Sequence, residues 1–410
     1  MSYLNQNSKK IFMSGLLTSK NKSVKIRRIS VIRVLSALLF LTVLNSLFAQ
    51  STQYDSLITA GIKQIYSLKY TKADSTFKYV QQKYPNQPAG KFFDAMIIWW
   101  KIMPDMNNEK YDDELNEKLD DVIEFCDSLL DENDENIEAV FFKGGALGFK
   151  GRLNALRSEW FDAAMNGKEA LPLVFKAYEI DSTNIDVQLG FGIYNYYAAV
   201  IPEKYPMLKP VMLFFPKGDR KKGLKQLIYA ADKSRYAKYE ARFMLMNIYY
   251  KFEKNYNQAL FYCNELLNEF PDNSVFEKYK GRILIKINRM KDAVNLYKGI
   301  LKKYDKGLPG YNNPLKREAL YYIGRDYFNK NIIDSSLIYF NECEALSKQI
   351  DGDKETGFRI NALLYIAKCN EKLGNIQKAL EQFNEVLKLD DFRKSHEAAK
   401  NYIYKIKNKK

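Results

Sequence analysis

Large apolar side chains recur at three- and four-residue spacings along most of this chain, and short polar stretches interrupt them at regular intervals. From Glu240, one apolar series ends near Lys254 and a second runs to Pro271. These spacings place side chains on one face of an α-helix, because the helix repeats every 3.6 residues. The pattern therefore predicts two amphipathic helices joined by a tight turn.

The same pair recurs along the chain. A second unit begins 34 residues later, at Ser274, and others begin at Arg317 and Ile360. The amino-terminal end repeats the pattern from Leu57 to Pro85. Each pair has an apolar face that only a neighbouring pair can bury, so we expect the pairs to stack into one all-α solenoid.

The pattern is looser in the middle of the chain. Three longer helix pairs fit there, over residues 88–133, 137–183 and 184–236, with acidic turns such as DENDEN between them. We predict about eight pairs over residues 50–393. The basic tail, residues 394–410, is expected to cap the last pair.

The period, the paired small residues and the prolines Pro85 and Pro271 resemble the tetratricopeptide repeat (TPR). In that repeat, small residues such as Ala259 let the two helices of a unit approach closely. The resemblance is strong for five units and looser over residues 88–236. It implies a right-handed α-solenoid that acts as a non-enzymatic scaffold for protein partners.

Residues 189–230 resemble the tetratricopeptide repeat protein 39 family, which includes the yeast inclusion-body clearance protein. The shared features are a glycine-rich aromatic helix, a proline-containing apolar segment and Gly-Asp-Arg followed by Gly-Leu. These positions are Gly190, Gly192, Pro202, Leu208, Lys209, Gly218, Asp219, Arg220, Gly223 and Leu224. The chain departs from the family in its leader and in Glu203, where a second proline is common. The resemblance implies fold and non-enzymatic character, not a cellular role.

The stretch LFFPKGDRKKGL, residues 213–224, raises the question of a phosphate-binding loop. Such a loop needs a preceding strand, more glycines and a Lys–Ser/Thr pair, and the stretch has none of these. Asp219 is instead a typical N-cap, followed by apolar residues at helical spacing. We predict that a helix begins here.

The first 49 residues predict a secretory signal peptide. They hold eight of the 64 basic residues and none of the 49 acidic ones, and a 15-residue apolar run ends just before Ala49. Cleavage after Ala49 would give an exported protein, periplasmic or associated with the outer membrane. An uncleaved anchor is the alternative, although a spanning helix needs about 20 apolar residues. Met13 is an alternative start.

Without the leader, the net charge falls from +15 to +7, because 56 basic residues then balance against 49 acidic ones. This removes most of the support for nucleic-acid binding.

Little in the sequence points to catalysis, a metal or a cofactor, and we expect none of the three. The one histidine, His396, lies in the polar tail. The acidic run over residues 112–121 lacks the glycine turn of a calcium loop. The four cysteines have no paired spacing and lie in apolar patterns, so buried thiols are expected in preference to disulfides; they are Cys126, Cys263, Cys343 and Cys369.

A candidate binding surface follows from the repeat register. In TPR proteins the fifth, ninth and thirteenth positions of the first helix face the concave groove. In the last three units most of these positions are basic, and the candidate partner-binding residues are Lys278, Arg282, Lys286, Tyr321, Arg325, Lys368 and Lys372. Aligned cations would attract an acidic segment or a C-terminal carboxylate of a protein partner. Solvated basic residues without a partner are the alternative.

Two other functions stay open. In the first, the protein is a ligand-binding protein or an enzyme with a pocket under residues 200–217. In the second, the apolar stretch 205–217 attaches the protein to a membrane surface. The richness in Tyr and Phe also invites a ligand-binding interpretation, but most of these residues fall on repeat core positions, which favours packing.

Overall fold

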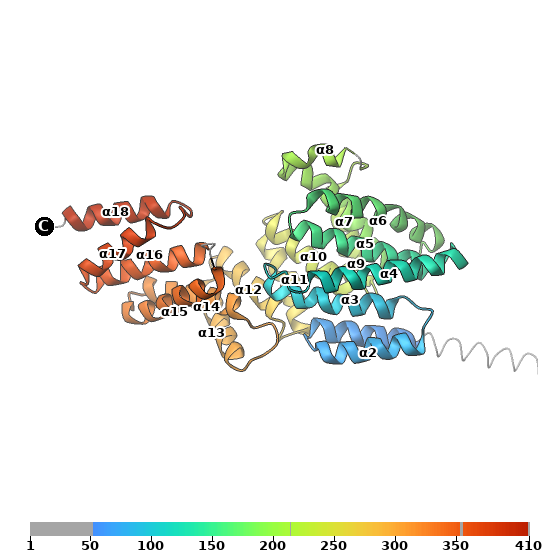
Figure 1. The fold of residues 1–410 in the computed structure, drawn as a ribbon, viewed down its shortest axis with the longest axis horizontal. Coiled ribbons are helices and arrows are strands. Elements are labelled where there is room, and N and C mark those ends of the chain that lie inside the picture. The colour runs from blue at the N-terminus through green and yellow to red at the C-terminus, as the bar shows by residue number, and fades with distance from the viewer. Residues whose placement is uncertain (1–51, 214, 353–355, 409–410) are drawn as a thin grey trace, which may run out of the picture. The chain divides into compact units, whose positions relative to one another are not determined.

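The computed structural model describes residues 52–213, 215–352 and 356–408, and every regular element within them is a helix (Figure 1). The predicted signal peptide lies outside the described residues. By its contacts the chain divides after Leu57. The unit from Ile58 onward contains the end of a helix over residues 52–66 and all the helices that follow.

The helices follow one another as pairs, and the all-α solenoid predicted from the sequence is confirmed. The helix over residues 52–66 precedes α2 (Tyr70–Lys83). The next pairs are α3 (Ala89–Ile102) with α4 (Asp112–Glu132), α5 (Ile137–Leu156) with α6 (Trp160–Ile180), α7 (Val187–Lys204) with α9 (Arg220–Lys233), α10 (Lys238–Lys251) with α11 (Tyr256–Glu269), α12 (Ser274–Lys286) with α13 (Met290–Asp305), α14 (Asn313–Asn329) with α15 (Ile333–Asp351), and α16 (Gly357–Lys372) with α17 (Ile376–Val386). The short elements lie within pairs: η1 (Met103–Asp105) lies between α3 and α4, and η2 (Pro206–Leu208) and α8 (Lys209–Met212) lie between α7 and α9. The last helix is α18 (Ser395–Asn408).

Close contact within a pair depends on a small residue in its first helix. A Cβ added to Gly281 would lie 2.6 Å from the Tyr297 ring, and one added to Gly324 would lie 3.2 Å from the Phe340 ring. Tyr297 and Phe340 are themselves fully buried. The small residues of the sequence pattern therefore mark where an aromatic ring of the second helix packs.

The stretch around Asp219 is a helix start, as predicted. The Asp219 carboxylate accepts a hydrogen bond from the backbone N–H of Lys222 at 2.9 Å. Gly218 and Gly223 serve contact with α7, since a Cβ on either would lie 2.5 Å from its backbone. Arg220, which follows the cap, donates to Glu253 at 2.9 Å.

The first pairs also contact helices far along the chain. The Tyr66 hydroxyl donates to Glu240 at 3.0 Å, and the Asn273 amide donates to the Tyr66 carbonyl at 2.7 Å. The rings of Trp100 and Phe276 meet edge to face at 5.6 Å. The amino-terminal pairs therefore lie against α10 and α12. In a solenoid where each pair contacts only its neighbours, these contacts would be absent.

At the carboxy-terminal end, α18 packs on α16 and α17, with Ala399 fully buried (Figure 1). All four cysteines are buried as free thiols. Within the described residues, no helix is both long and apolar enough to cross a membrane.

Candidate functional site

The predicted groove residues lie in three different environments. Lys278 of α12 is buried, with 7% of its surface exposed. Its ammonium donates to the carbonyl oxygen of Pro104 at 3.1 Å, where η1 lies against α12. Burial lowers the pKa of Lys278 to about 8. This lysine holds two distant segments together and does not face an open groove.

Arg282, one turn further, is engaged in an ion pair. Its guanidinium donates to both carboxylate oxygens of Glu318 on α14, at 2.8 and 2.5 Å. Tyr297 donates to the same carboxylate at 3.0 Å. Glu318 and its hydrogen bonds raise the pKa of Arg282, although burial opposes the rise. Most of the charge of Arg282 is therefore balanced within the protein.

Arg325 and Lys368 have no carboxylate partner among the described residues. The Arg325 guanidinium lies over the rings of Tyr321 and Tyr322, at 5.9 and 5.7 Å, and its buried Nε has no acceptor in the described part of the chain. The Lys368 ammonium lies over the Tyr365 ring at 4.8 Å. Burial lowers the pKa of Lys368, because no neighbouring anion offsets the loss of water.

The two cations lie on one surface shared by α14 and α16. Tyr365 of α16 contacts Phe328 of α14 at 5.1 Å. Lys372 donates to Asn331 at 2.9 Å across the same junction. Lys286, the remaining predicted cation, is exposed at the end of α12.

One cation of this surface was missed from the sequence. Arg393 precedes α18 at a positive φ of 52° and is exposed. Its guanidinium lies 5.1 Å from the centre of the Phe392 ring, which packs on Gly357 at the start of α16. Burial and Glu318 raise the pKa of Tyr322 on α14, and the guanidiniums of Arg325, Arg282 and Arg393 oppose the rise. Arg393 comes from the turn after the last repeat, and no periodic position marks it. We call Arg325, Lys368 and Arg393 the cationic surface.

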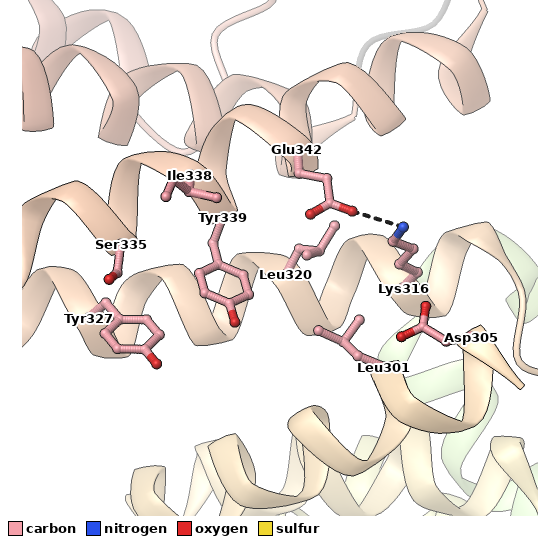
Figure 2. Close-up of a pocket in the computed structure, with 9 residues that line it drawn as sticks. All are labelled: Leu301, Asp305, Lys316, Leu320, Tyr327, Ser335, Ile338, Tyr339 and Glu342. Carbon is pink, nitrogen blue, oxygen red and sulfur yellow. Dashed lines mark ion pairs between the residues drawn. The ribbon is translucent and has the colours of Figure 1, made fainter.

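A pocket of about 430 Å³ lies nearby between α13, α14 and α15 (Figure 2). Lys316 and Glu342 form an ion pair across it at 2.8 Å, as the dashed line in Figure 2 shows. None of the predicted groove residues lines this pocket. Because its central cation is already paired, the pocket offers less to an anionic partner than the cationic surface.

A larger cavity of about 680 Å³ lies in the amino-terminal half. Its wall comes from α3, α5, α6, α7 and α10, and α6 contributes both small residues and larger ones such as Trp160 and Leu173. Trp99, Phe149 and Tyr197 are among the aromatic side chains that line it. Other aromatic residues, such as Phe77 and Phe340, are fully buried in the repeat cores, as the packing interpretation expects.

The charged groups of the cavity wall neutralise one another. The Arg152 guanidinium donates to Glu240 at 2.6 Å and lies 4.7 Å from the centre of the Trp99 ring. Glu240 also accepts a hydrogen bond from the Tyr66 hydroxyl. Burial is the larger cause, and this carboxylate the next, that raises the pKa of that hydroxyl. The pair thus presents little net charge to the cavity.

Residues 205–213, which we call the cover segment, and Phe215 contribute to one side of the cavity. Tyr205, Met212 and Phe215 line it. Tyr205 stacks on Trp160 of α6 at 6.1 Å. A cavity thus lies beside residues 205–213, where the sequence left a ligand-binding or enzymatic pocket open as an alternative.

The other groups considered for chemistry have structural partners. His396 contacts the carbonyl oxygen of Leu389 at 2.8 Å. In the acidic run, Asp112 pairs with Arg157 and Asp120 with Lys150. Among the described residues no three His, Cys, Asp or Glu side chains lie together as a metal site would require.

Stacked helix pairs with small residues under aromatic rings define the class: a helical-repeat protein. Residues 240–273 and 361–390 match the family model described as tetratricopeptide repeat. The chain therefore contains tetratricopeptide repeats. No curated protein matches the sequence.

Several solved structures are similar in fold. The Cut9–Hcn1 hetero-tetramer of the APC/C aligns with 82% of this chain at 13% identity and a TM-score of 0.47, and the match spans 52% of that chain. The human IFIT1 dimer with m7Gppp-AAAA aligns with 78% of this chain and 68% of its own, at 12% identity and a TM-score of 0.38. The C-terminal part of a TPR repeat-containing protein from Cytophaga hutchinsonii aligns with 75% of this chain and 99% of its own, at 16% identity and a TM-score of 0.34. No conclusion about function follows from these likenesses.

Proposed function

We propose that this protein is an exported, non-enzymatic scaffold of the bacterial cell envelope that binds an acidic segment of a partner protein on its cationic surface. The observation that carries the proposal is that Arg325 and Lys368 have no carboxylate partner among the described residues and are flanked by aromatic rings. A half-buried cation without an anion is costly, and a carboxylate from a partner removes that cost.

Export rests on the leader and remains part of the proposal, as does the envelope location. The resemblance of residues 189–230 to the tetratricopeptide repeat protein 39 family adds non-enzymatic character. The partner segment is expected to be acidic or to end in a free C-terminal carboxylate, since a bidentate arginine contact fits either.

The test compares two charge-reversal variants of residues 50–410 in pull-downs from envelope extracts. Arg325→Glu/Lys368→Glu should lose the partner by about tenfold or more, because each partly buried charged hydrogen bond contributes about 1–3 kcal/mol. Lys291→Glu/Lys302→Glu, on the exposed face of α13, makes the same charge change away from the surface and should retain binding. Arg282 is left intact, because its reversal would place a second carboxylate beside Glu318.

Equal capture by both variants and the wild type would reject the cationic surface. Equal loss in both would mean that only net charge matters. Binding should also weaken as salt rises from low to physiological concentration, because exposed charges are screened.

A second candidate function, attachment to a membrane surface through residues 205–217, is favoured by one observation. Met207 and Leu213 expose 79% and 85% of their surface. Co-sedimentation with anionic vesicles tests it: Met207→Asp/Leu213→Asp should reduce the bound fraction, and unchanged recovery would reject attachment through this segment.

A further inference from the structure

Small residues keep the large cavity open, because larger side chains at the same positions would fill it. On α5, Gly144 and Gly151 allow α6 to approach, with added Cβ atoms at 3.3 Å from Leu173 and 3.1 Å from Ala163. Gly148, between them, lines the cavity, and a Cβ there would meet nothing within 4 Å. A side chain at Gly148 would extend into the cavity, so the glycine leaves that volume free at a cost in helix stability.

The small residues of α6 have the same effect. Ala163, Ala164 and Gly167 face the cavity, and α6 touches α7 over only a short stretch. Ile193 and Tyr197 of α7 therefore remain half-buried beside open space. The cavity thus extends between two helices that in a regular repeat would pack together.

A polar ligand would find few partners in the interior. Arg152, Glu240 and Tyr66 satisfy one another. Asp186 accepts from the backbone N–H groups of residues 236 and 237, and the Asn247 amide donates to the Phe243 carbonyl. The indole N–H of Trp99 is buried in this wall without an acceptor among the described residues. Since the other polar groups named here already have partners, the interior still favours a mainly apolar occupant.

The edge of the cavity has the opposite character. Lys251 lines the cavity and is exposed, so it stands at the opening. Lys204 lies beside it, donating to the Lys251 carbonyl at 3.2 Å and lying 4.0 Å from the centre of the Phe252 ring. Neither ammonium has a carboxylate partner in the described residues, because the nearby Glu253 is held by Arg220 and Tyr196.

We infer that this cavity binds a single-chain amphiphile of the long-chain fatty acid class, with its chain among α3, α5, α6 and α7 and its carboxylate beside Lys204 and Lys251. The volume of about 680 Å³ lies within the range of ligand cavities. The site is separate from the cationic surface, so the two proposals stand or fall independently. The cover segment, through Tyr205 and its stack on Trp160, lies where the chain enters.

The first experiment measures binding of the fluorescent fatty acid cis-parinaric acid to purified residues 50–410, with displacement by palmitate. Saturable binding is expected. Among unbranched acids shorter than palmitate, affinity should rise about fourfold for each added methylene, since each buries apolar surface. Binding that does not saturate, or affinity independent of chain length, would overturn the inference.

Two glycine variants locate the site. Gly148→Leu should weaken binding at least tenfold by filling the cavity, and Gly148→Ala should weaken it less. Gly299→Leu is the matched control: Gly299 also lies within a helix, α13, with nothing within 4 Å of an added Cβ, but outside the cavity. Circular dichroism verifies that each variant is helical. Equal affinity of Gly148→Ala, Gly148→Leu and Gly299→Leu would refute the assigned site.

The headgroup is tested with palmitate and hexadecanol. Lys204→Gln/Lys251→Gln should weaken palmitate by about threefold to tenfold and leave hexadecanol unchanged, because exposed ion pairs are individually modest. Lys291→Gln/Lys302→Gln is the charge control. Equal affinity of the wild type for acid and alcohol would overturn the headgroup assignment. Displacement of the probe by an apolar peptide but not by palmitate would assign the cavity to a protein segment instead.

Discussion

Replacement of Gly223 by alanine tests the packing of α9 against α7. The added Cβ would lie 2.5 Å from the backbone nitrogen of Tyr196 and 2.9 Å from the carbonyl oxygen of Gly192. Both are backbone atoms of α7, so no side chain can rotate away and the two helices have to separate. Overpacking of this kind costs about 1–3 kcal/mol. Two backbone contacts under 3 Å place Gly223 in the upper part of this range, about 2–3 kcal/mol. Alanine returns up to about 1 kcal/mol of helix propensity, which leaves a net loss of about 1–2 kcal/mol.

Urea unfolding followed by far-UV circular dichroism measures this loss, with Gly148→Ala and Gly299→Ala as controls. Both controls add the same methyl group inside a helix where nothing lies within 4 Å. They should therefore stabilise the protein by about 0.5–1 kcal/mol. Replacement of glycine by alanine should thus destabilise the protein at position 223 and stabilise it at positions 148 and 299. A Gly223→Ala protein as stable as the wild type would refute the close approach of α7 and α9.

Four further outcomes are expected. Ala259→Trp and Ala379→Trp, at fully buried contacts within a pair, should each lower the free energy of unfolding by about 1–3 kcal/mol or more in the same assay, and wild-type melting of both would contradict the repeat register. Glu318→Gln should cost about 2 kcal/mol, below the 3–5 kcal/mol of a fully buried pair because a third of the Arg282 side chain is exposed; an unchanged urea midpoint would argue against the pair. Burial lowers the pKa of Lys278 to about 8, so from pH 8 to 10 the unfolded chain binds more protons than the folded one. Over that window the free energy of unfolding of the wild type should therefore rise by about 2 kcal/mol relative to that of Lys278→Met. A difference that stays constant with pH would mean that Lys278 is not desolvated. Export predicts a protein that begins near Gln50, and mass spectrometry that finds peptides from residues 25–48 on envelope material would contradict cleavage.

The repeat architecture was predictable because local patterns carry it. Gly281 and Gly324 stand where the rings of Tyr297 and Phe340 must fit, and that spacing is visible in one dimension. The start of α9 was predictable for the same reason, since the Asp219 side chain caps the helix through the backbone N–H of Lys222, only three residues further along the chain.

The candidate site was less predictable because it depends on contacts between units. Lys278 occupies a groove position of its repeat, but η1 returns against α12 and buries it. Arg282 is neutralised by a residue of the next unit. The cavity has no sequence signal of its own, because Gly148 and Gly299 look alike until their neighbours are known.

The contact of the first pairs with α10 and α12 has a consequence for the order of folding. The hydrogen bond from Asn273 to Tyr66 joins residues 207 positions apart, and that from Tyr66 to Glu240 joins residues 174 apart. Such contacts form only after a long loop has closed, so the amino-terminal half gains them together and late. The pairs from α14 onward contact mainly their neighbours and can assemble or fray one at a time. The amino-terminal half should therefore unfold as one cooperative unit, whereas the last helices can unfold locally while the cavity stays intact.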